Sequence, residues 1–218
     1  MKKAFQDTMK ILFLVLQPTK NINLNQDYVG IGGMFCNLIE RRKINAMTKK
    51  EFNFNALGRM LLKSDNLCDG SIYSEAYSIH VLTSIFNRCG LTIDLFKTET
   101  DIGYFFDNCK KMDYVINVSN ENFVNRLGVE VKRIMDFNGL VILNKDYVFG
   151  VLDNANSKAF ESNRNVLESD RWDAQILHIL TNNEIVIQYI DLWISSRQKI
   201  GYISIFTTII IGNSNIIY

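Results

Sequence analysis

The chain has 218 residues, of which 47% are apolar and 22% are charged, and its formal net charge is +1. This length suits one domain with a sizeable core, so we expect residues 1–218 to form a single domain. The balanced charge argues against a protein that binds nucleic acid over its whole surface, although it is compatible with a local basic patch.

No segment reaches the roughly 18 continuous apolar residues that a membrane-spanning helix needs. The sequence therefore predicts an intracellular, cytoplasmic protein without membrane contact. Proline occurs once, and asparagine is abundant, as in proteins encoded by AT-rich genomes. The two histidines and four cysteines are widely spaced, and they are His80, His178, Cys36, Cys68, Cys89 and Cys109. Without a C-x-x-C pair we predict reduced thiols, no metal site and no cofactor.

The first half of the chain predicts mostly helices. The clearest of them runs from Tyr73 to Cys89, because Tyr77, Val81, Ile85 and Cys89 repeat every four residues. Gly90 follows this repeat and is expected to end the helix. The other expected elements are a strand from Ile11 to Leu16, a loop from Thr19 to Gly33, a helix from Met34 to Arg42, and a helix that starts at the capping box Thr48 to Glu51 and reaches about Lys63.

The second half predicts more strands. A hairpin is expected where the apolar runs Leu140 to Leu143 and Tyr147 to Leu152 flank three polar residues. The other expected elements are strands at Leu91 to Phe96, Tyr114 to Val118 and Tyr202 to Ile211, the last of them central in the sheet, a helix from Asp101 to Lys111, and one or two helices between Asp170 and Ser195. Because helices come first and most strands later, we expect an α+β fold.

Three stretches resemble the Josephin domain, a deubiquitinase module related to papain. They are DGSIYSEAYSIHVLTSIFNRCGLTIDLF at residues 69–96, NGLVILNKDYVFGVLDN at residues 138–154, and GYISIF at residues 201–206. The resemblance implies N-terminal helices packed on a mostly antiparallel sheet. A helix at residues 140–152 would contradict it, because the family carries its catalytic histidine on a hairpin there.

The resemblance also implies that catalysis has been lost. Gln26 matches the family's oxyanion glutamine, but the nucleophile position falls between Gly30 and Gly33, where there is no cysteine. Asn138 stands at the position of the histidine, and Asp153 stands at that of the residue that orients it. The sequence therefore predicts an inactive Josephin-like module that binds ubiquitin or docks on a large assembly such as a proteasome or ribosome.

Three alternatives stay open. A shift of the first helix places Cys36 at the nucleophile position of an active deubiquitinase, although no histidine accompanies it. Arg171 and His178 match the loose spacing of helical HEPN-type ribonucleases. A basic cluster offers a surface for RNA or another acidic partner, and it comprises Arg41, Arg42, Lys43, Lys49 and Lys50.

Overall fold

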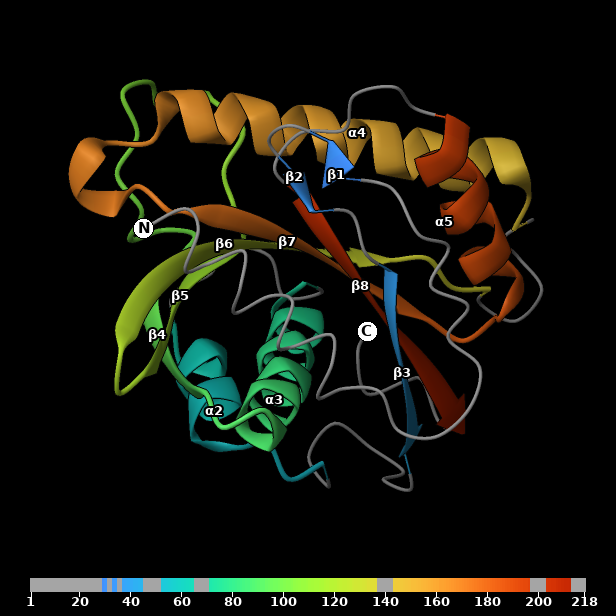
Figure 1. The fold of residues 1–218 in the computed structure, drawn as a ribbon, viewed down its shortest axis with the longest axis horizontal. Helices are drawn as coiled ribbons and strands as arrows, with labels where there is room; N and C mark the ends of the chain where they lie inside the picture. Colours follow the sequence, from blue (N-terminus) through green and yellow to red (C-terminus); the bar gives the residue numbers. More distant parts are fainter. Residues whose placement is uncertain are drawn as a thin grey trace.

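A six-stranded mixed sheet forms the centre of the protein in the computed structural model (Figure 1). The structure describes residues 29–30, 33–34, 37–44, 52–64, 71–136, 143–196 and 203–212. The strands lie in the order β3-β8-β7-β6-β5-β4. Their bounds are β3 Asn37–Ile44, β4 Thr92–Thr98, β5 Tyr114–Asn120, β6 Phe123–Arg133, β7 Ala174–Thr181 and β8 Ile203–Gly212, and a separate small hairpin pairs β1 Val29–Gly30 with β2 Gly33–Met34.

The sheet has a parallel half and an antiparallel half. β3, β8, β7 and β6 are paired in parallel, whereas β6, β5 and β4 form an antiparallel meander. The α+β class is confirmed, but the expected mostly antiparallel sheet is wrong, because three of its five strand pairings are parallel. Parallel pairing is possible here because helices provide the crossovers between successive strands.

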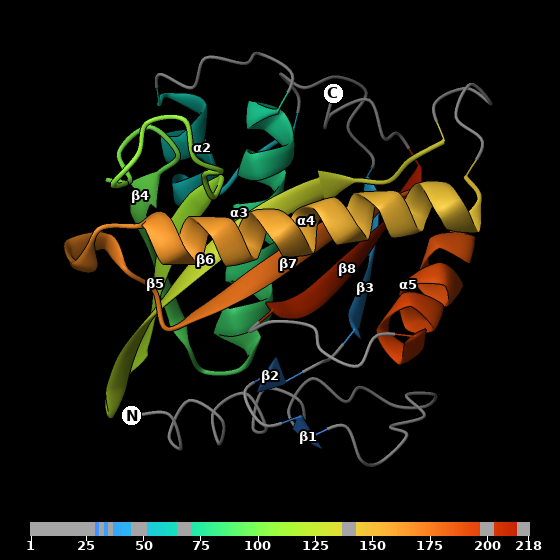
Figure 2. The ribbon, with the colours of Figure 1, turned by 90° about the horizontal axis from the view of Figure 1, so that it is seen from above.

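Helices cover both faces of the sheet. α2 Ala56–Leu62 and α3 Ile72–Arg88 lie on one face, and α4 Lys145–Asn165 and α5 Ile185–Ser196 lie on the other (Figures 1 and 2). Two large apolar clusters fill the space between helices and strands, one under α3 and one under α4 and α5. Among the described residues, no helix is long and apolar enough to cross a membrane.

The central helix of the first half is confirmed. α3 spans Ile72–Arg88, and the predicted core residues Ile79, Val81, Leu82, Ile85 and Phe86 are all buried. Gly90 ends the helix with a φ angle of +72°, a conformation that glycine adopts without a steric penalty. The chain then turns directly into β4, which confirms the strand predicted at Leu91 to Phe96.

The predicted hairpin at residues 140–152 is wrong. From Lys145 onward the chain is helical as α4, while residues 140–142 lie outside the described part. Asn144 caps the helix by accepting a hydrogen bond from the Tyr147 N–H at 2.9 Å. Val148, Leu152 and Ala155 then face the core at helical spacing. The stretch that was matched to the histidine-bearing hairpin of the Josephin family is therefore helical from Lys145 onward.

Other elements also differ from expectation. Residues 37–42 were expected in a helix but form β3, which pairs with β8 along its full length. The segment Asp101 to Lys111 is an irregular loop, and its backbone groups bond to other parts of the chain, as in the Phe105 N–H to Asn165 O bond of 2.8 Å. The segment from Asp170 starts at the end of the 3₁₀ turn Glu168–Asp170 and contains the buried strand β7, and only its last part, α5, is an α-helix.

Several predictions hold in part or lie outside the described residues. The strands at Tyr114 to Val118 and Tyr202 to Ile211 correspond to β5 and β8, and β8 is an interior strand as expected. The helix expected from Thr48 begins only at Ala56, capped by Asn55, which accepts from the Gly58 N–H at 2.8 Å. The strand expected at Ile11 to Leu16 lies outside the described residues.

Candidate functional site

The positions implied by the papain-like comparison do not meet in a described site. Gly30 and Gly33 pair with each other in the small β1–β2 hairpin. Asp153 lies on α4, where it accepts a hydrogen bond of 3.0 Å from the Trp193 indole N–H of α5 and so joins two helices. Gln26, Cys36 and Asn138 lie outside the described residues.

The two residues matched to a helical ribonuclease, Arg171 and His178, differ in burial. His178 lies on strand β7, is fully buried, and bonds to Ser78 Oγ at 2.7 Å and to Thr208 Oγ1 at 2.8 Å. Burial lowers the pKa of His178 to about 3, so the ring is neutral at physiological pH. Arg171 is partly exposed and forms an ion pair of 2.9 Å with Glu168. The expected helical context for these residues is wrong, and His178 instead ties α3 to the sheet.

A side-chain contact is known for one member of the predicted basic cluster. Arg42 on β3 donates a hydrogen bond of 2.9 Å to Ser84 Oγ of α3. This contact binds the helix layer to an edge strand, which is a structural use of the cation. Arg41 and Lys43 belong to the same strand, while Lys49 and Lys50 lie outside the described residues.

A cluster of acids and lysines gathers where β5 begins and β6 continues past it. Lys158 of α4 forms ion pairs with Asp113 at 2.9 Å and with the Glu130 carboxylate, which also pairs with Lys132. Asp113 and Glu130 are both buried. We call these four residues, Asp113, Glu130, Lys132 and Lys158, the acid–lysine cluster.

The backbone explains how these residues meet. The two residues Glu130 and Lys132 are two apart on β6, so their side chains point to the same face of the sheet. β5 and β6 are registered with Tyr114 opposite Val129, which places Asp113 beside them at the point where β5 starts. The Asp113 carboxylate accepts from the Val131 N–H at 2.6 Å, a group that β5 no longer reaches.

Two further acids, Glu75 and Glu99, lie near enough to the cluster to interact with its charges. Glu75, in the first turn of α3, is buried, and Glu99 follows the end of β4. Burial raises the pKa of Glu75 to about 8, and the negative charge of Asp113 adds to this effect. The same two causes raise the pKa of Glu99. Carboxyl groups crowded in this way resist full ionisation until a cation neutralises them.

The remaining charges of the cluster are coupled. Burial and Asp113 raise the pKa of Glu130 to about 7, although Lys158 and Lys132 oppose the rise. Burial alone would lower the pKa of Lys158, but Asp113 and Glu130 outweigh it and hold this pKa above its ordinary value. Strongly shifted pKa values that arise from burial together with specific charges are typical of functional sites.

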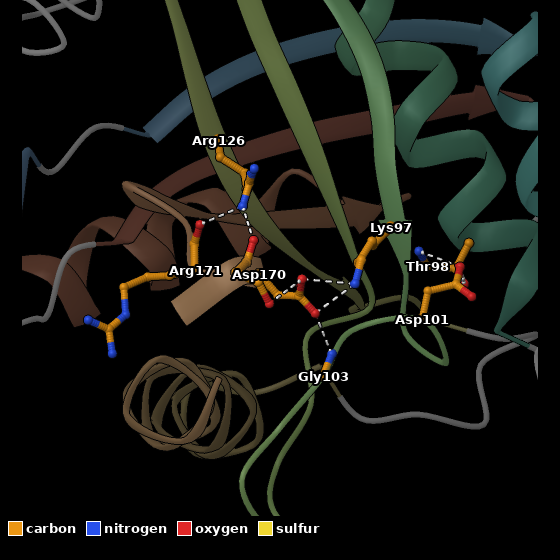
Figure 3. Close-up of polar contacts among 8 residues, drawn as sticks. Lys97, Thr98, Asp101, Gly103, Arg126, Asp170 and Arg171 are labelled. Atoms are coloured by element: carbon orange, nitrogen blue, oxygen red, sulfur yellow. Dashed lines mark hydrogen bonds and ion pairs between the residues drawn. The ribbon is translucent and has the colours of Figure 1, made fainter. Parts of the chain in front are cut away.

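A second cluster on the same sheet uses similar residues differently. Asp170, in the short 3₁₀ turn Glu168–Asp170, accepts from Lys97 Nζ at 2.8 Å through both oxygens and from the Gly103 N–H at 2.7 Å (Figure 3). Arg126 beside it donates to the Ser169 and Arg171 carbonyl oxygens at 2.7 and 3.3 Å. We call this group the Asp170 clamp. Its contacts fasten the turn at Asp170 to β4, to β6 and to the loop at Gly103.

A pocket lies on the same face of the sheet as the acid–lysine cluster. Its lining comes from the end of α4 and the start of β7, and it comprises Asn163, Arg164, Arg171, Trp172, Asp173, Ala174 and Gln175. The Trp172 ring packs on Gly128, where a Cβ atom would approach the ring to 2.9 Å. Gly128 stands two residues before Glu130 on the same face of β6, a spacing of about 7 Å. The pocket and the cluster therefore lie along the same face of β6, and two of the residues that line the pocket are arginines.

Sequence reasoning missed the acid–lysine cluster. The signal was present: Glu130 and Lys132 interrupt an apolar β run at alternate positions, and Asp113 precedes another apolar run. Charges of opposite sign on the face of a buried strand require partners. Because β6 itself was not predicted, this alternation was not recognised.

The comparisons with known proteins identify no function. No family model and no solved structure matches the chain. A stretch of 139 residues is 28% identical to the "AAC-rich mRNA clone AAC4 protein" of Dictyostelium discoideum. This alignment covers 61% of the chain and 19% of that protein, so the chain spans about a fifth of the relative's length.

Proposed function

We propose that the protein is a divalent-cation-dependent phosphodiesterase that cleaves nucleic acid at the acid–lysine cluster. The carrying observation is that Asp113 and Glu130 hold one cationic group, Lys158 Nζ, between them, with a second lysine on the same strand face. Carboxylates and a cation beside a lysine suit a reaction in which a phosphate must be neutralised and attacked.

The donor set fits a hard cation such as Mg²⁺ or Mn²⁺. Such ions prefer carboxylate oxygens and keep several waters or substrate phosphates in their shell. Among the described residues, no three His, Cys, Asp or Glu side chains stand close enough together to hold a metal ion by themselves. In this proposal Asp113 and Glu130 would be the two protein ligands, and the ion would have to displace the Lys158 ammonium, which pairs with both.

The chain's own residues then have distinct tasks. In hydrolysis, a water oxygen bonds to phosphorus and the bond from phosphorus to one ester oxygen breaks. A base takes a proton from the attacking water, and the leaving oxygen takes a proton from solvent. We assign proton acceptance to Glu75 and phosphate neutralisation to Lys132. A bound divalent cation supplies Lewis-acid stabilisation of the phosphoryl oxygens. With a pKa of about 8, Glu75 gains its basic form as the pH rises through that value.

The pocket on the same face of the sheet supports the proposal of a polymeric substrate. Arg164 and Arg171 line it together with the amide side chains of Asn163 and Gln175. Arginine guanidinium groups suit phosphate recognition because their donors match phosphate oxygens in pairs. A backbone phosphate in this pocket would place the next phosphodiester near the acid–lysine cluster.

The test is cleavage of labelled single-stranded and duplex DNA and RNA by the purified full chain, with Mg²⁺, Mn²⁺ or EDTA. Asp113→Asn and Glu130→Gln should each reduce cleavage at least 10²-fold, since each removes charge that holds the cation. Asp94→Asn, an exposed acid on β4, is the matched control and should cleave normally. Cleavage that persists in EDTA or in both cluster variants would contradict the proposal.

A further inference from the structure

The loop that leads into Asp113 carries two exposed aromatic rings. Phe105 is 62% exposed and Phe106 is 67% exposed, although phenylalanine usually lies in the core. The loop connects β4 to β5, and Asp113 is its last residue before β5 begins at Tyr114. Two adjacent phenyl rings therefore face solvent seven and eight residues before a member of the proposed catalytic cluster.

The loop is closed and fastened. The Met112 N–H donates to Tyr104 Oη at 2.9 Å, which joins the two ends of the loop at its base. The Phe105 N–H bonds to the Asn165 carbonyl at 2.8 Å, and the Lys110 N–H bonds to Glu161 Oε1 at 3.1 Å, so α4 supports the loop from one side. Because the base is anchored beside Asp113, the exposed rings hold a defined position relative to the cluster.

Cations accompany the exposed rings. Lys110 and Lys111 lie between the two rings and Asp113 in the sequence. The loop also contains the acids Glu99, Asp101 and Asp107, of which Asp107 directly follows the rings. On α4, next to the loop-binding Glu161, Phe160 is 64% exposed and has the Arg164 guanidinium 5.5 Å from its ring centre. Rings interleaved with cations complement a chain that offers both base faces and phosphates.

We infer that this loop is a stacking platform that binds unpaired bases of single-stranded nucleic acid and leads the strand to the acid–lysine cluster. The inference rests on the proposed phosphodiesterase function and specifies its substrate. Paired bases are stacked within a duplex and cannot offer their faces to Phe105 and Phe106. The platform therefore favours single strands over duplex.

The test measures binding apart from cleavage. Fluorescence anisotropy in EDTA follows a labelled 20-nucleotide single strand, and its duplex, bound to the full chain. Base stacking on an aromatic ring contributes about 1–3 kcal/mol, so Phe105→Ala/Phe106→Ala should weaken single-strand binding roughly 10–100-fold. Duplex binding should change less than threefold. Met60→Ala/Val124→Ala, which removes two exposed apolar side chains from α2 and β6, is the control and should bind normally.

The outcomes separate the platform from the catalytic proposal. If the wild type binds single strands through these rings but cleaves nothing with any cation, the phosphodiesterase proposal fails and the platform stands. If cleavage is found but the double variant binds single strands as the wild type does, the platform is wrong. A double variant that loses self-association instead of nucleic-acid binding would also overturn it, because the rings would then join two copies of the chain. Phe105→Tyr/Phe106→Tyr should restore binding if the alanine variant is folded.

Discussion

Two buried acids on the same sheet show how differently a carboxylate can be used. Asp170 receives Lys97 and the Gly103 N–H in short hydrogen bonds, and burial, which alone would raise its pKa, is outweighed, so the pKa lies below its ordinary value. At the acid–lysine cluster, burial and, after it, the charge of Asp113 raise the pKa of Glu130 despite its two lysine partners. A carboxylate that accepts several hydrogen bonds is stable in its charged form and contributes to the stability of the fold. Buried carboxylates close to one another are more stable in their charged form when a cation lies beside them.

The largest expected effect separates the lysines of the two clusters. Lys132→Met should reduce nucleic-acid cleavage about 10²–10³-fold, because a positive group near the developing phosphate charge is lost. Lys97→Met, which removes the lysine of the Asp170 clamp, should retain most cleavage at a temperature where the variant stays folded. Initial rates with matched circular dichroism spectra test this. Equal losses in both variants would mean that Lys132 acts only through the fold.

The next effect concerns the crowded acid of α3. The native pKa of Glu75 is about 8 and lies above the ordinary value of 4.5. Between these values the native state holds a proton that the unfolded state releases, so stability falls as pH rises. Glu75→Gln removes this loss and should raise the free energy of unfolding by about 2–4 kcal/mol at pH 8, with little change at pH 4.5.

Chemical denaturation in EDTA at the two pH values measures the effect of Glu75→Gln. The same variant should lose most of its cleavage and the rise of the cleavage rate with pH. A residue that destabilises the fold while supporting catalysis is expected at a functional site. If the variant is less stable than the wild type at pH 8, Glu75 is a structural residue that belongs with Asp170.

Neutralising Asp170 should lower the free energy of unfolding, whereas neutralising Glu75 should raise it. Asp170→Asn leaves Lys97 without its charge partner and weakens the bond from the Gly103 N–H. Because Lys97 is 30% exposed, water compensates part of the loss, and we expect destabilisation of about 1–3 kcal/mol at neutral pH. The wild type and variant should converge as pH falls and the carboxylate is protonated. Urea unfolding measures these free energies. If Asp170→Asn is more stable than the wild type, the carboxylate of Asp170 does not stabilise the fold and the proposed difference from Glu75 is wrong.

For the Josephin resemblance we expect no effect of a substitution at Cys36 on ubiquitin-chain cleavage. The predicted inactive module should not cleave ubiquitin chains, and Cys36→Ala should behave as the wild type does. Cleavage by the wild type that the variant lacks would favour the active deubiquitinase. Binding of ubiquitin, a proteasome or a ribosome stays a prediction, and pull-down of each purified partner tests it beside nucleic-acid binding.

Local patterns were sufficient where one element contains the whole signal. The four-residue repeat from Tyr77 to Cys89 is possible only as a helix with one buried face, so α3 was predicted almost to the residue. The β-branched run before Ile211 likewise indicated an interior strand, and β8 lies between β3 and β7.

Local patterns failed where short apolar runs fit both a strand and a buried helix. Tyr147 to Leu152 looks β-rich in isolation, but as the first turns of α4 it places Val148 and Leu152 against the core. Conversely, the segment that contains β7 was expected to be helical, but its apolar run is a strand that is buried on both faces. In each case the neighbouring elements decided between helix and strand: α4 packs on the sheet, and β7 pairs with β6 and β8.

Taken alone, the sequence determined the α+β class, the central helix α3 and the interior strand β8, because these depend on composition and on periodicity within one element. It also contained Asp113, Glu130 and Lys158, but not their proximity. Asp113 and Lys158 are 45 positions apart in the chain and meet at 2.9 Å only because the β5–β6 register and the packing of α4 bring them together. The candidate site is a product of tertiary structure, since charges so distant in sequence interact only after strands and helix enclose them.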